Sequence, residues 1–558
     1  MTPPAAASAA AGLAGALFAL SWLLPVRRLP WLSFEADLCA AAALACLLVP
    51  VLQANGHRVQ VPRTALAVAG LALVPLAQWA CGLIVYRGDA VLTALYLCGL
   101  SLAIVVGAHA GESFRPVGRT MAWALAVAGV CSALLALRQW LEWPSTHPWV
   151  LDMTPGTRPG AQLLQPNLLA TLLLLAIGAV AVLADRGTGA WRRAAALGAV
   201  ALMALALVVT QSRTGVLALA GLAAWGLAVR RRAGLRDWSF ALLVVLAAVL
   251  VGVAARPGLS DWLGLTRLPS ARVMLAETRP VHWATLVDAL RASPVQGYGW
   301  NQVALAQAAA DLDHPSGEFI EHSHNLVLDL LVWNGLPLGL AIVAAMAAWA
   351  LVRVRRCRDP GTAALLGVLL VLGVHAMTEF PLDYFGFLMA FGLAVGAIEQ
   401  RTSARSAPTV PRVGLLAGAW GVLLLVGIVV LDHARLAPAH AAMRADWSAH
   451  GPDLPTATAG PVLLLTQLQS QVRAMRSPIT SQATLGDVDE LRNVARRYAF
   501  APVLLRLALV DQRQGRPALA QAALDRLCRL HPPHVCERSR AQFNAALQPA
   551  TIETGFGK

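Results

Sequence analysis

The feature that most limits the fold of this chain is a series of apolar stretches, each about 20 residues long, that recurs from the N-terminus to about residue 431. A helix of that length crosses the hydrocarbon core of a bilayer, which is about 30 Å thick. The composition agrees, because 57% of the residues are hydrophobic and 13% are charged, against about 45–50% and about 25% in soluble domains. The sequence therefore predicts an all-α polytopic membrane protein and excludes a soluble enzyme.

Thirteen segments have the length and hydropathy of membrane-spanning helices. They are residues 5–24, 36–53, 64–85, 90–109, 120–141, 163–184, 194–210, 214–229, 238–255, 325–352, 361–378, 384–398 and 413–431. A long connection, residues 256–324, separates the ninth segment from the tenth. We therefore expect a transmembrane domain over residues 1–431, with 256–324 as its large loop.

The remaining tail, residues 432–558, is not apolar enough to span a membrane. Its stretch PVLLRLALVDQRQGRPALAQAALDRLCRLHP has apolar residues at helical spacing on both sides of Gln514-Gly515-Arg516. That pattern is typical of a helix–turn–helix of the tetratricopeptide kind. The sequence predicts a soluble helical domain here.

The distribution of arginines predicts the orientation in the membrane. The net charge of +14 could indicate nucleic-acid binding, but the arginines gather in short loops between apolar segments. With the N-terminus placed in the cytoplasm, six inside loops hold 18 arginines and five short outside loops hold 5. Positively charged loops resist translocation. We expect this orientation, with loop 256–324 and the C-terminal domain outside, and no nucleic-acid partner.

The cysteines do not form a metal or haem motif. Five of the eight lie in apolar segments, where a free thiol behaves as a small hydrophobic group. Cys528 and Cys536 flank a short Pro/His turn in the predicted outside domain, and the sequence leaves open whether they form a disulfide. No spacing predicts a metal ion or a cofactor.

Several ionisable groups lie where a membrane disfavours them. Arg213 stands between two apolar segments with almost no loop around it, and a charge at membrane depth costs at least about 2.5–3.5 kcal/mol. It could be an arginine that snorkels to the interface. Because an outside arginine opposes the positive-inside bias, a binding role is the better interpretation.

The loop 256–324 carries the largest number of reactive groups. It contains Arg272 and Arg279, and it ends in His322 and His324 directly before an apolar helical segment. Exposed histidines are often inert, and this pair lacks the third ligand that a zinc site needs. A neutral imidazole, with a pKa near 6.5, is suited to accept a proton from a hydroxyl. We therefore expect His324 to act as a base at the mouth of a helix.

Two other outside turns carry polar groups. Glu379 could be an ordinary interfacial carboxylate, or it could orient an imidazole or pair with an arginine. Gln165 and Asn167 flank Pro166, which prevents regular helix entry. Their amides could mark the start of a helix or contact a sugar.

Together these motifs resemble the bacterial protein O-oligosaccharyltransferases, which are relatives of the O-antigen ligases and O-antigen polymerases. The superfamily signals are the turn at 212–215 (SRTG), the loop motif at 297–300 (GYGW), and His324-Asn325 followed by Gly335. Four further segments resemble the oligosaccharyltransferase branch, as does the C-terminal extension. They are 29–34 (LPWLSF), 75–79 with 86–89 (PLAQW and YRGD), 165–167 (QPN) and 379–382 (EFPL). The chain departs from the family pattern at Leu168, Asp383 and Leu338.

The resemblance implies a GT-C-like membrane fold in a bacterial inner membrane, with the outside compartment being the periplasm. It implies transfer of a glycan from undecaprenyl diphosphate to Ser or Thr hydroxyls of periplasmic proteins, such as pilin-like proteins or lipoproteins, without a metal. By this analogy Arg213 and Arg279 bind the diphosphate, and Arg272 is a further candidate for the same role. His324 is then the general base, and Glu379 or Tyr298 orients it.

Three other functions remain open at this point. An O-antigen ligase would use the same donor and transfer the glycan to lipid A–core. An O-antigen polymerase is disfavoured by the C-terminal domain and the four branch-like segments. A transporter is disfavoured because the polar residues gather at one face of the membrane and not at its midplane.

Overall fold

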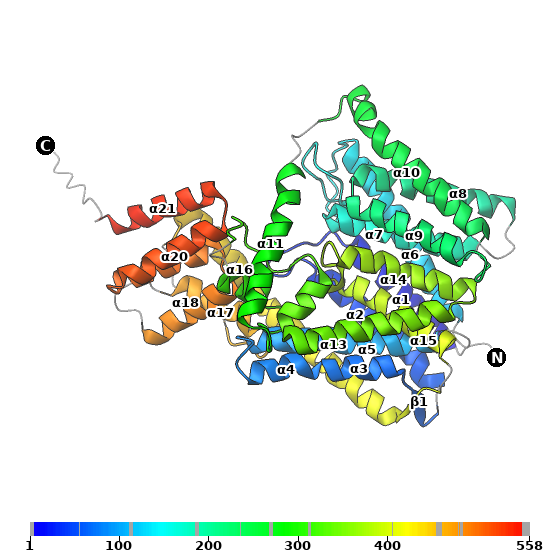
Figure 1. Cartoon of the computed structure of the whole chain (residues 1–558), viewed down its shortest axis with the longest axis horizontal. Coiled ribbons are helices and arrows are strands. Elements are labelled where there is room, and N and C mark those ends of the chain that lie inside the picture. Colours follow the sequence, from blue (N-terminus) through cyan, green and yellow to red (C-terminus); the bar gives the residue numbers. More distant parts are fainter. Residues whose placement is uncertain are drawn as a thin grey trace.

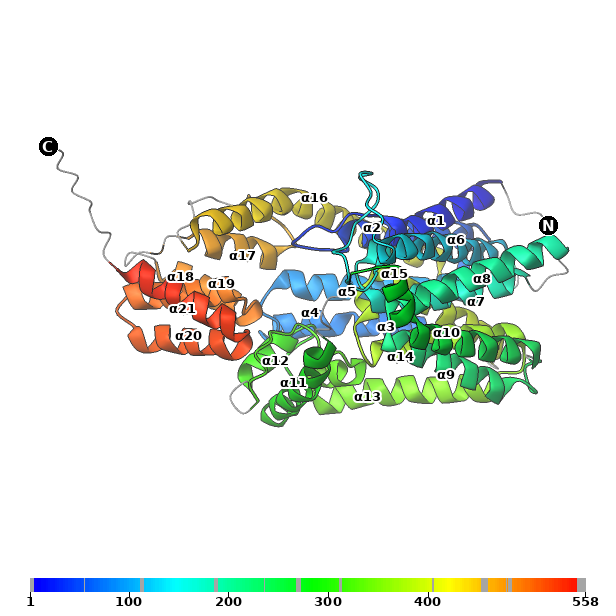
Figure 2. The same ribbon diagram turned by 90° about the horizontal axis from the view of Figure 1, so that it is seen from above.

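The computed structural model describes residues 5–54, 56–110, 115–184, 189–234, 236–266, 272–310, 314–403, 406–452, 460–477, 479 and 484–548. The described residues are almost entirely helical, and the fold class expected from the sequence is confirmed. A long bundle of helices is joined at one end to a small helical domain formed by the last part of the chain (Figures 1 and 2).

Each of the thirteen predicted segments falls on a helix. The helices of the bundle are α1 (Ala5–Leu23), α2 (Phe34–Ala54), α3 (Arg63–Leu71), α4 (Leu73–Ala80), α5 (Arg87–His109), α6 (Arg115–Trp140), α7 (Pro166–Ala184), α8 (Ala190–Thr210), α9 (Arg213–Val229), α10 (Arg236–Trp262), α13 (Leu326–Arg356), α14 (Pro360–Ala376), α15 (Phe385–Thr402) and α16 (Arg412–His450). Within the described residues, nine helical stretches are long and apolar enough to cross a membrane and three further apolar helices are shorter. The protein is therefore a multi-pass membrane protein.

The structure divides one of the predicted segments and lengthens others. The segment 64–85 is divided at Ala72 into α3 and α4. Pro75 explains the break, because its ring has no N–H for the carbonyl four residues earlier and displaces it. The last segment does not end at residue 431, because α16 continues to His450. Its second half is rich in alanine and charged residues, which favour a helix but not a membrane.

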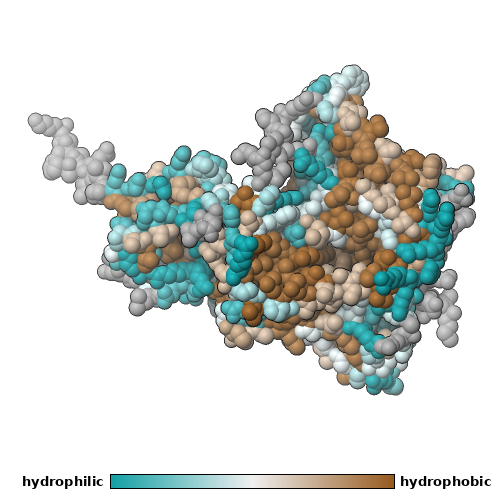
Figure 3. All heavy atoms as spheres, viewed as in Figure 1, coloured by the Kyte–Doolittle hydropathy of each residue, from teal (hydrophilic) through white to brown (hydrophobic). Residues whose placement is uncertain are grey.

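Loops predicted on one side of the membrane lie together in space. At one end, a short antiparallel pair joins β1 (Arg58–Gln60) to β2 (Thr409–Pro411), and Arg401 pairs with Asp359 at 2.8 Å. The C-terminal domain is attached at the opposite end (Figure 1). The surface between these ends is predominantly hydrophobic, whereas the C-terminal domain is largely hydrophilic (Figure 3). The loops 54–63, 353–360 and 399–412, which are all predicted to lie inside, are therefore together at the end of the bundle opposite to the C-terminal domain.

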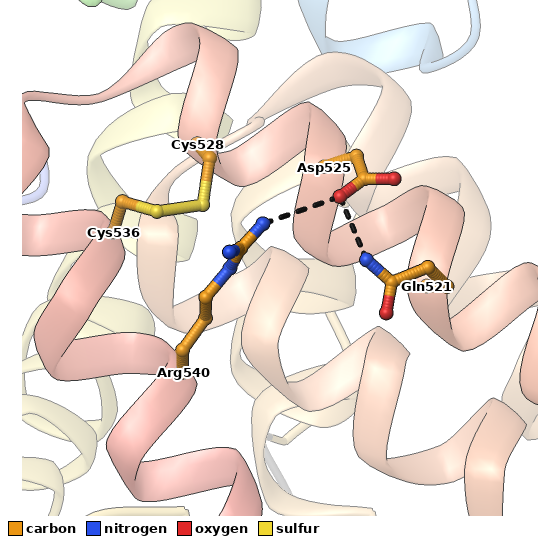
Figure 4. The surroundings of a disulfide bond; sticks show 5 residues. All are labelled: Gln521, Asp525, Cys528, Cys536 and Arg540. Carbon is orange, nitrogen blue, oxygen red and sulfur yellow. Dashed lines mark hydrogen bonds and ion pairs between the residues drawn. A yellow bond between two sulfur atoms is a disulfide. The ribbon is translucent and has the colours of Figure 1, made fainter.

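The predicted loop 256–324 contains two helices, α11 (Arg272–Ala292) and α12 (Val303–Ala309), which lie between the bundle and the C-terminal domain. The C-terminal domain consists of α17 (Thr466–Arg476), α18 (Leu485–Arg497), α19 (Ala501–Arg513), α20 (Pro517–Leu530) and α21 (Pro533–Leu547). The turn at Gln514-Gly515-Arg516 separates α19 from α20, as the sequence predicts. A disulfide between Cys528 and Cys536 joins α20 to α21 (Figure 4).

Candidate active site

The candidate site lies where several helices begin or end, at the end of the bundle that carries the C-terminal domain. Asn167 is in the first turn of α7 and Arg213 is the first residue of α9. His324 precedes the start of α13 by two residues, and Glu379 follows the end of α14 by three. Arg279 projects from α11. Residues far apart in the sequence therefore meet at a single place.

Glu379 is the centre of this cluster. Its Oε1 accepts a hydrogen bond from Arg279 Nη2 at 2.6 Å and another from Asn167 Nδ2 at 3.1 Å. Its Oε2 is 2.9 Å from His324 Nδ1. The carboxylate is 9% exposed, whereas the side chains of His324 and Arg279 are 26% and 35% exposed. The carboxylate is thus covered by groups that still reach the solvent.

The charge of Glu379 is stabilised by these partners. Burial alone favours the neutral carboxyl, but the hydrogen bond with His324 and the charges of His324 and Arg279 outweigh it and hold the pKa of Glu379 below its ordinary value. An ionised carboxylate can only accept hydrogen bonds, so the proton of a neutral His324 lies on Nδ1. The lone pair of Nε2 is then directed away from Glu379 and is available as a base.

The backbone before α13 holds His324 in a constrained position. His324 has a left-handed φ of +57°, which is uncommon for a residue other than glycine. Asn325 Oδ1 then accepts the N–H groups of Val327 and Leu328 and so caps α13. On the other side, Trp283 Nε1 donates to the carbonyl of Ser323 at 2.8 Å. The backbone is therefore held on both sides of His324.

Asn167 connects Glu379 to the start of α9. Its Oδ1 accepts from Ser212 Oγ at 2.7 Å and from Arg158 Nη2 at 3.2 Å, while its Nδ2 donates to Glu379. Ser212 Oγ also caps α9 by accepting from Gly215 N at 2.9 Å. Each polar atom of the Asn167 amide therefore has a defined partner within the cluster.

Arg213 is placed by its two neighbours in the chain. Ser212 reaches Asn167, and Thr214 Oγ1 is 3.0 Å from Thr378 Oγ1, one residue before Glu379. The Arg213 side chain is exposed and makes no hydrogen bond or ion pair with any residue that the structure describes. It is a cation beside the cluster that remains available to a ligand.

The other residues expected at the site lie in different surroundings. Gln165 accepts the N–H of Leu168 at 2.8 Å and so caps α7, which supports its interpretation as a helix start. His322 pairs with Asp383 at 3.0 Å and stacks on Phe380. The side chain of Arg272 lies outside the described residues. Among those that are described, no group of three or more His, Cys, Asp or Glu residues is arranged to hold a metal ion.

Tyr298 does not contact His324, because its hydroxyl donates to the carbonyl of Ala289 at 2.9 Å. Its motif instead packs against a break in α13 at Gly335, where φ is +70°. The N–H groups of Tyr298 and Gly299 donate to the carbonyls of Val332 and Trp333 at 2.9 and 3.0 Å. The loop motif therefore sets the position of the first half of α13, whose start follows His324.

Sequence reasoning missed two members of the network. Arg158, which donates to Asn167 and, through Nε, to the carbonyl of Thr210 at 2.9 Å, was not among the candidates. The signal that singled out Arg213, an arginine in a short outside loop, applies equally to Arg158. Trp283 was also missed, because an aromatic residue in such a loop gives no sign that it holds a backbone carbonyl.

Comparisons with known proteins identify two similar families and several similar proteins. Residues 198–343 match the family described as O-antigen ligase, and residues 363–546 match the C-terminal region of the virulence factor membrane-bound polymerases. A general O-oligosaccharyltransferase of Acinetobacter baylyi is 26% identical over 565 aligned positions, which cover 96% of this chain and 94% of that protein.

Two further relatives match parts of the chain. A ComP-specific O-oligosaccharyltransferase of the same organism is 30% identical over 131 positions, or 23% of this chain and 24% of that protein. An exopolysaccharide production protein of Rhizobium meliloti is 30% identical over 252 positions, or 42% of this chain and 56% of that protein.

The helical membrane fold, the cluster at its polar end and these matches define a membrane-embedded glycosyltransferase. More particularly, the chain is similar over almost its whole length to a bacterial general O-oligosaccharyltransferase, and parts of it match the O-antigen ligases and the membrane-bound polymerases.

Proposed function

We propose that this protein transfers a glycan from undecaprenyl diphosphate to Ser or Thr hydroxyls of proteins in the bacterial periplasm. The observation that carries the proposal is the contact of His324 Nδ1 with Glu379 Oε2 at 2.9 Å, while Arg279 holds the other oxygen of the same carboxylate. This geometry directs Nε2 of His324 away from the carboxylate and places the imidazole beside cationic groups, an arrangement that the transfer requires.

The reaction can be written as a single displacement. The acceptor hydroxyl oxygen attacks the anomeric carbon, the bond from that carbon to the diphosphate oxygen breaks, and the hydroxyl proton passes to His324 Nε2. The diphosphate is already a good leaving group, so the protein has to stabilise its growing charge. Arg213 and Arg279 supply guanidinium groups suited to that task. Attack from the opposite face inverts the anomeric centre.

The lipid tail of the donor would lie among the membrane helices. An apolar cavity of about 350 Å³ is present between α2, α5, α15 and α16, and it is lined by Phe34, Tyr96, Phe385 and Trp420 among others. Phe385 is six residues beyond Glu379 in the chain. This short separation supports a donor whose diphosphate and lipid tail both bind next to the segment 379–385.

The proposed orientation places the site and the C-terminal domain in the periplasm of the inner membrane, with the N-terminus in the cytoplasm. The arginine asymmetry of the loops supports it. The disulfide between Cys528 and Cys536 supports it as well, because such bonds persist in oxidising compartments.

The test is a reconstituted assay with a defined undecaprenyl-diphosphate donor, offered in parallel a pilin-like protein, a lipoprotein and lipid A–core. We expect glycosylated protein as the product, and its complete loss in His324→Ala with normal membrane insertion. Transfer to lipid A–core alone would identify an O-antigen ligase, which is the second candidate because residues 198–343 match that family. Unchanged transfer by His324→Ala would refute the role of His324.

A further inference from the structure

The motif at 86–89 (YRGD), at the start of α5, is in contact with the C-terminal domain along its whole length. Tyr86 is buried within the hydrophobic core of that domain. Arg87 donates to the carbonyl of Leu463, and Gly88 N donates to Thr466 Oγ1 at 3.2 Å. The candidate site does not include this motif, so its function requires a separate explanation.

The fit at the motif is close. A Cβ atom on Gly88 would lie 2.4 Å from the carbonyl oxygen of Leu464, so only glycine is accommodated there. Asp89 Oδ2 accepts from Arg497 Nε at 3.0 Å, and both side chains are almost completely buried. A buried ion pair is retained only when its geometry is well satisfied. The motif is therefore a place where the C-terminal domain docks on the membrane bundle.

Arg497 also extends to the segment that carries His324. Its Nη1 is 3.5 Å from Glu321 Oε1, three residues before His324. Nearby, Phe319 packs edge-on against Phe500 with ring centroids 5.1 Å apart. The C-terminal domain thus holds the segment before His324 by a charge and by a ring contact.

A third contact comes from the end of α20, where the carbonyl of Arg529 accepts the N–H of Gly317 at 3.0 Å. The segment 317–321 is therefore held by α18, by the start of α19 and by the end of α20. Gln307 of α12 also holds it, because its side chain bonds the carbonyl of Glu318 and the N–H of Ile320. The residues 323–325 are held by α11 and α13, so the contacts with the C-terminal domain are confined to the first half of the segment.

We propose that Arg497 is a positioning residue, which joins the docking motif at Asp89 to Glu321 and so sets the place of His324. The inference rests on the proposed function, because it takes His324 to be the base. Arg497 itself does not touch the reacting atoms. The C-terminal domain is then a structural part of the active site, and the docking motif and the domain depend on each other.

The first test is Glu321→Gln, which removes the charge facing Arg497 and leaves the pair of Arg497 with Asp89 in place. Glu321 is 45% exposed, so we expect the melting temperature of the full chain to change by less than about 2 °C. We expect kcat to fall about three- to tenfold with the donor KM within about twofold. An unchanged kcat would overturn the proposal.

The second test exchanges the charges. Asp89→Arg with Arg497→Asp keeps an ion pair at the docking site but places a carboxylate opposite Glu321, and we expect kcat to fall at least tenfold. Addition of Glu321→Arg should restore most of the lost kcat. Full activity in the double variant, or no recovery in a folded triple variant, would overturn the proposal. If the variant with the exchanged charges does not fold, the kcat of Glu321→Gln is the measurement that tests the proposal.

A matched control is Arg492→Gln on the same helix, because Arg492 pairs with Asp511 and Asp489 and with no residue of the segment 317–325 that the structure describes. We expect its kcat to be unchanged. His324→Ala is measured in parallel to separate the two hypotheses. Activity in His324→Ala refutes the proposed function, whereas an inactive His324→Ala beside a fully active Glu321→Gln refutes only the positioning role.

Discussion

Replacement of Glu379 by glutamine tests the site most directly, because the structure determines how the new amide must be oriented. Oε1 of residue 379 receives hydrogen bonds from Arg279 and from Asn167, and both groups are donors. The oxygen of the glutamine must therefore remain at that position, and its NH₂ group must face His324. The amide then donates to Nδ1, whereas the carboxylate accepted from it.

The consequence is a change of tautomer. With Nδ1 accepting, the single proton of neutral His324 moves to Nε2, which can no longer take a proton from the acceptor hydroxyl. General-base catalysis is worth about 10²–10⁴-fold, which corresponds to about 2.7–5.4 kcal/mol of activation free energy. The serine-protease triad shows a loss of about 10⁴-fold for the equivalent Asp-to-Asn change. We expect kcat of Glu379→Gln to fall by about 10²–10⁴-fold.

The assay is steady-state transfer by the purified, reconstituted chain at pH 7, with donor and acceptor varied separately. The donor KM should not rise, because Arg279 loses a competing carboxylate. Asp525→Asn is the matched control, because it makes the same acid-to-amide change in the ion pair of Asp525 with Arg540 in the C-terminal domain (Figure 4). The side chain of Asp525 is 44% exposed. A folded Glu379→Gln variant with kcat within about threefold of the unaltered protein would refute the tautomer argument.

Two further predictions concern stability. The pKa of Glu379 is held below its ordinary value in the folded state. The ionised carboxylate therefore stabilises the fold fully above about pH 4.5, and this stabilisation is lost as the pH falls through the lowered pKa. We expect the melting temperature, followed by tryptophan fluorescence, to decrease below about pH 4.5, and to decrease less steeply in Glu379→Gln. Gly335→Ala would place a Cβ 2.1 Å from the carbonyl oxygen of Val295 at a φ of +70°, and we expect a loss of at least about 1–3 kcal/mol together with weaker activity, measured by thermal unfolding and by transfer. A Gly335→Ala protein as stable as the unaltered one would show that the break in α13 is not required.

The transmembrane part of the fold was predictable because the bilayer imposes a length and a polarity on each helix. Every apolar segment meets that constraint, and all thirteen segments are helical in the structure, one of them as the two helices α3 and α4. The same criterion cannot detect structure outside the membrane. It therefore ended the last segment at residue 431, although α16 continues to His450, and it treated as a loop the region that contains α11 and α12.

The sequence identified the members of the site, His324 and Glu379 from their chemistry and Arg279 from the resemblance to a known family, but it did not identify their contacts. His324, Arg279 and Glu379 were singled out as a base, a phosphate ligand and an orienting group, and the structure brings the three together. The choice between Glu379 and Tyr298 as the partner of His324 depended on which residue is near in space. Tyr298 is held away by backbone hydrogen bonds to α13, a tertiary contact that no local pattern reports.

The electrostatic design of the site follows from the directions of its helices. The N-termini of α7, α9 and α13 all lie at the cluster, and each carries partial positive charge from its unpaired N–H groups. Arg158, Arg213 and Arg279 add three full charges, against the single carboxylate of Glu379, so with a neutral His324 the cluster has an excess of two positive charges. A diphosphate supplies at least two negative charges, and it would meet this excess at helix ends that favour anions. One carboxylate is therefore enough to fix the imidazole, and a second would weaken the attraction for the donor.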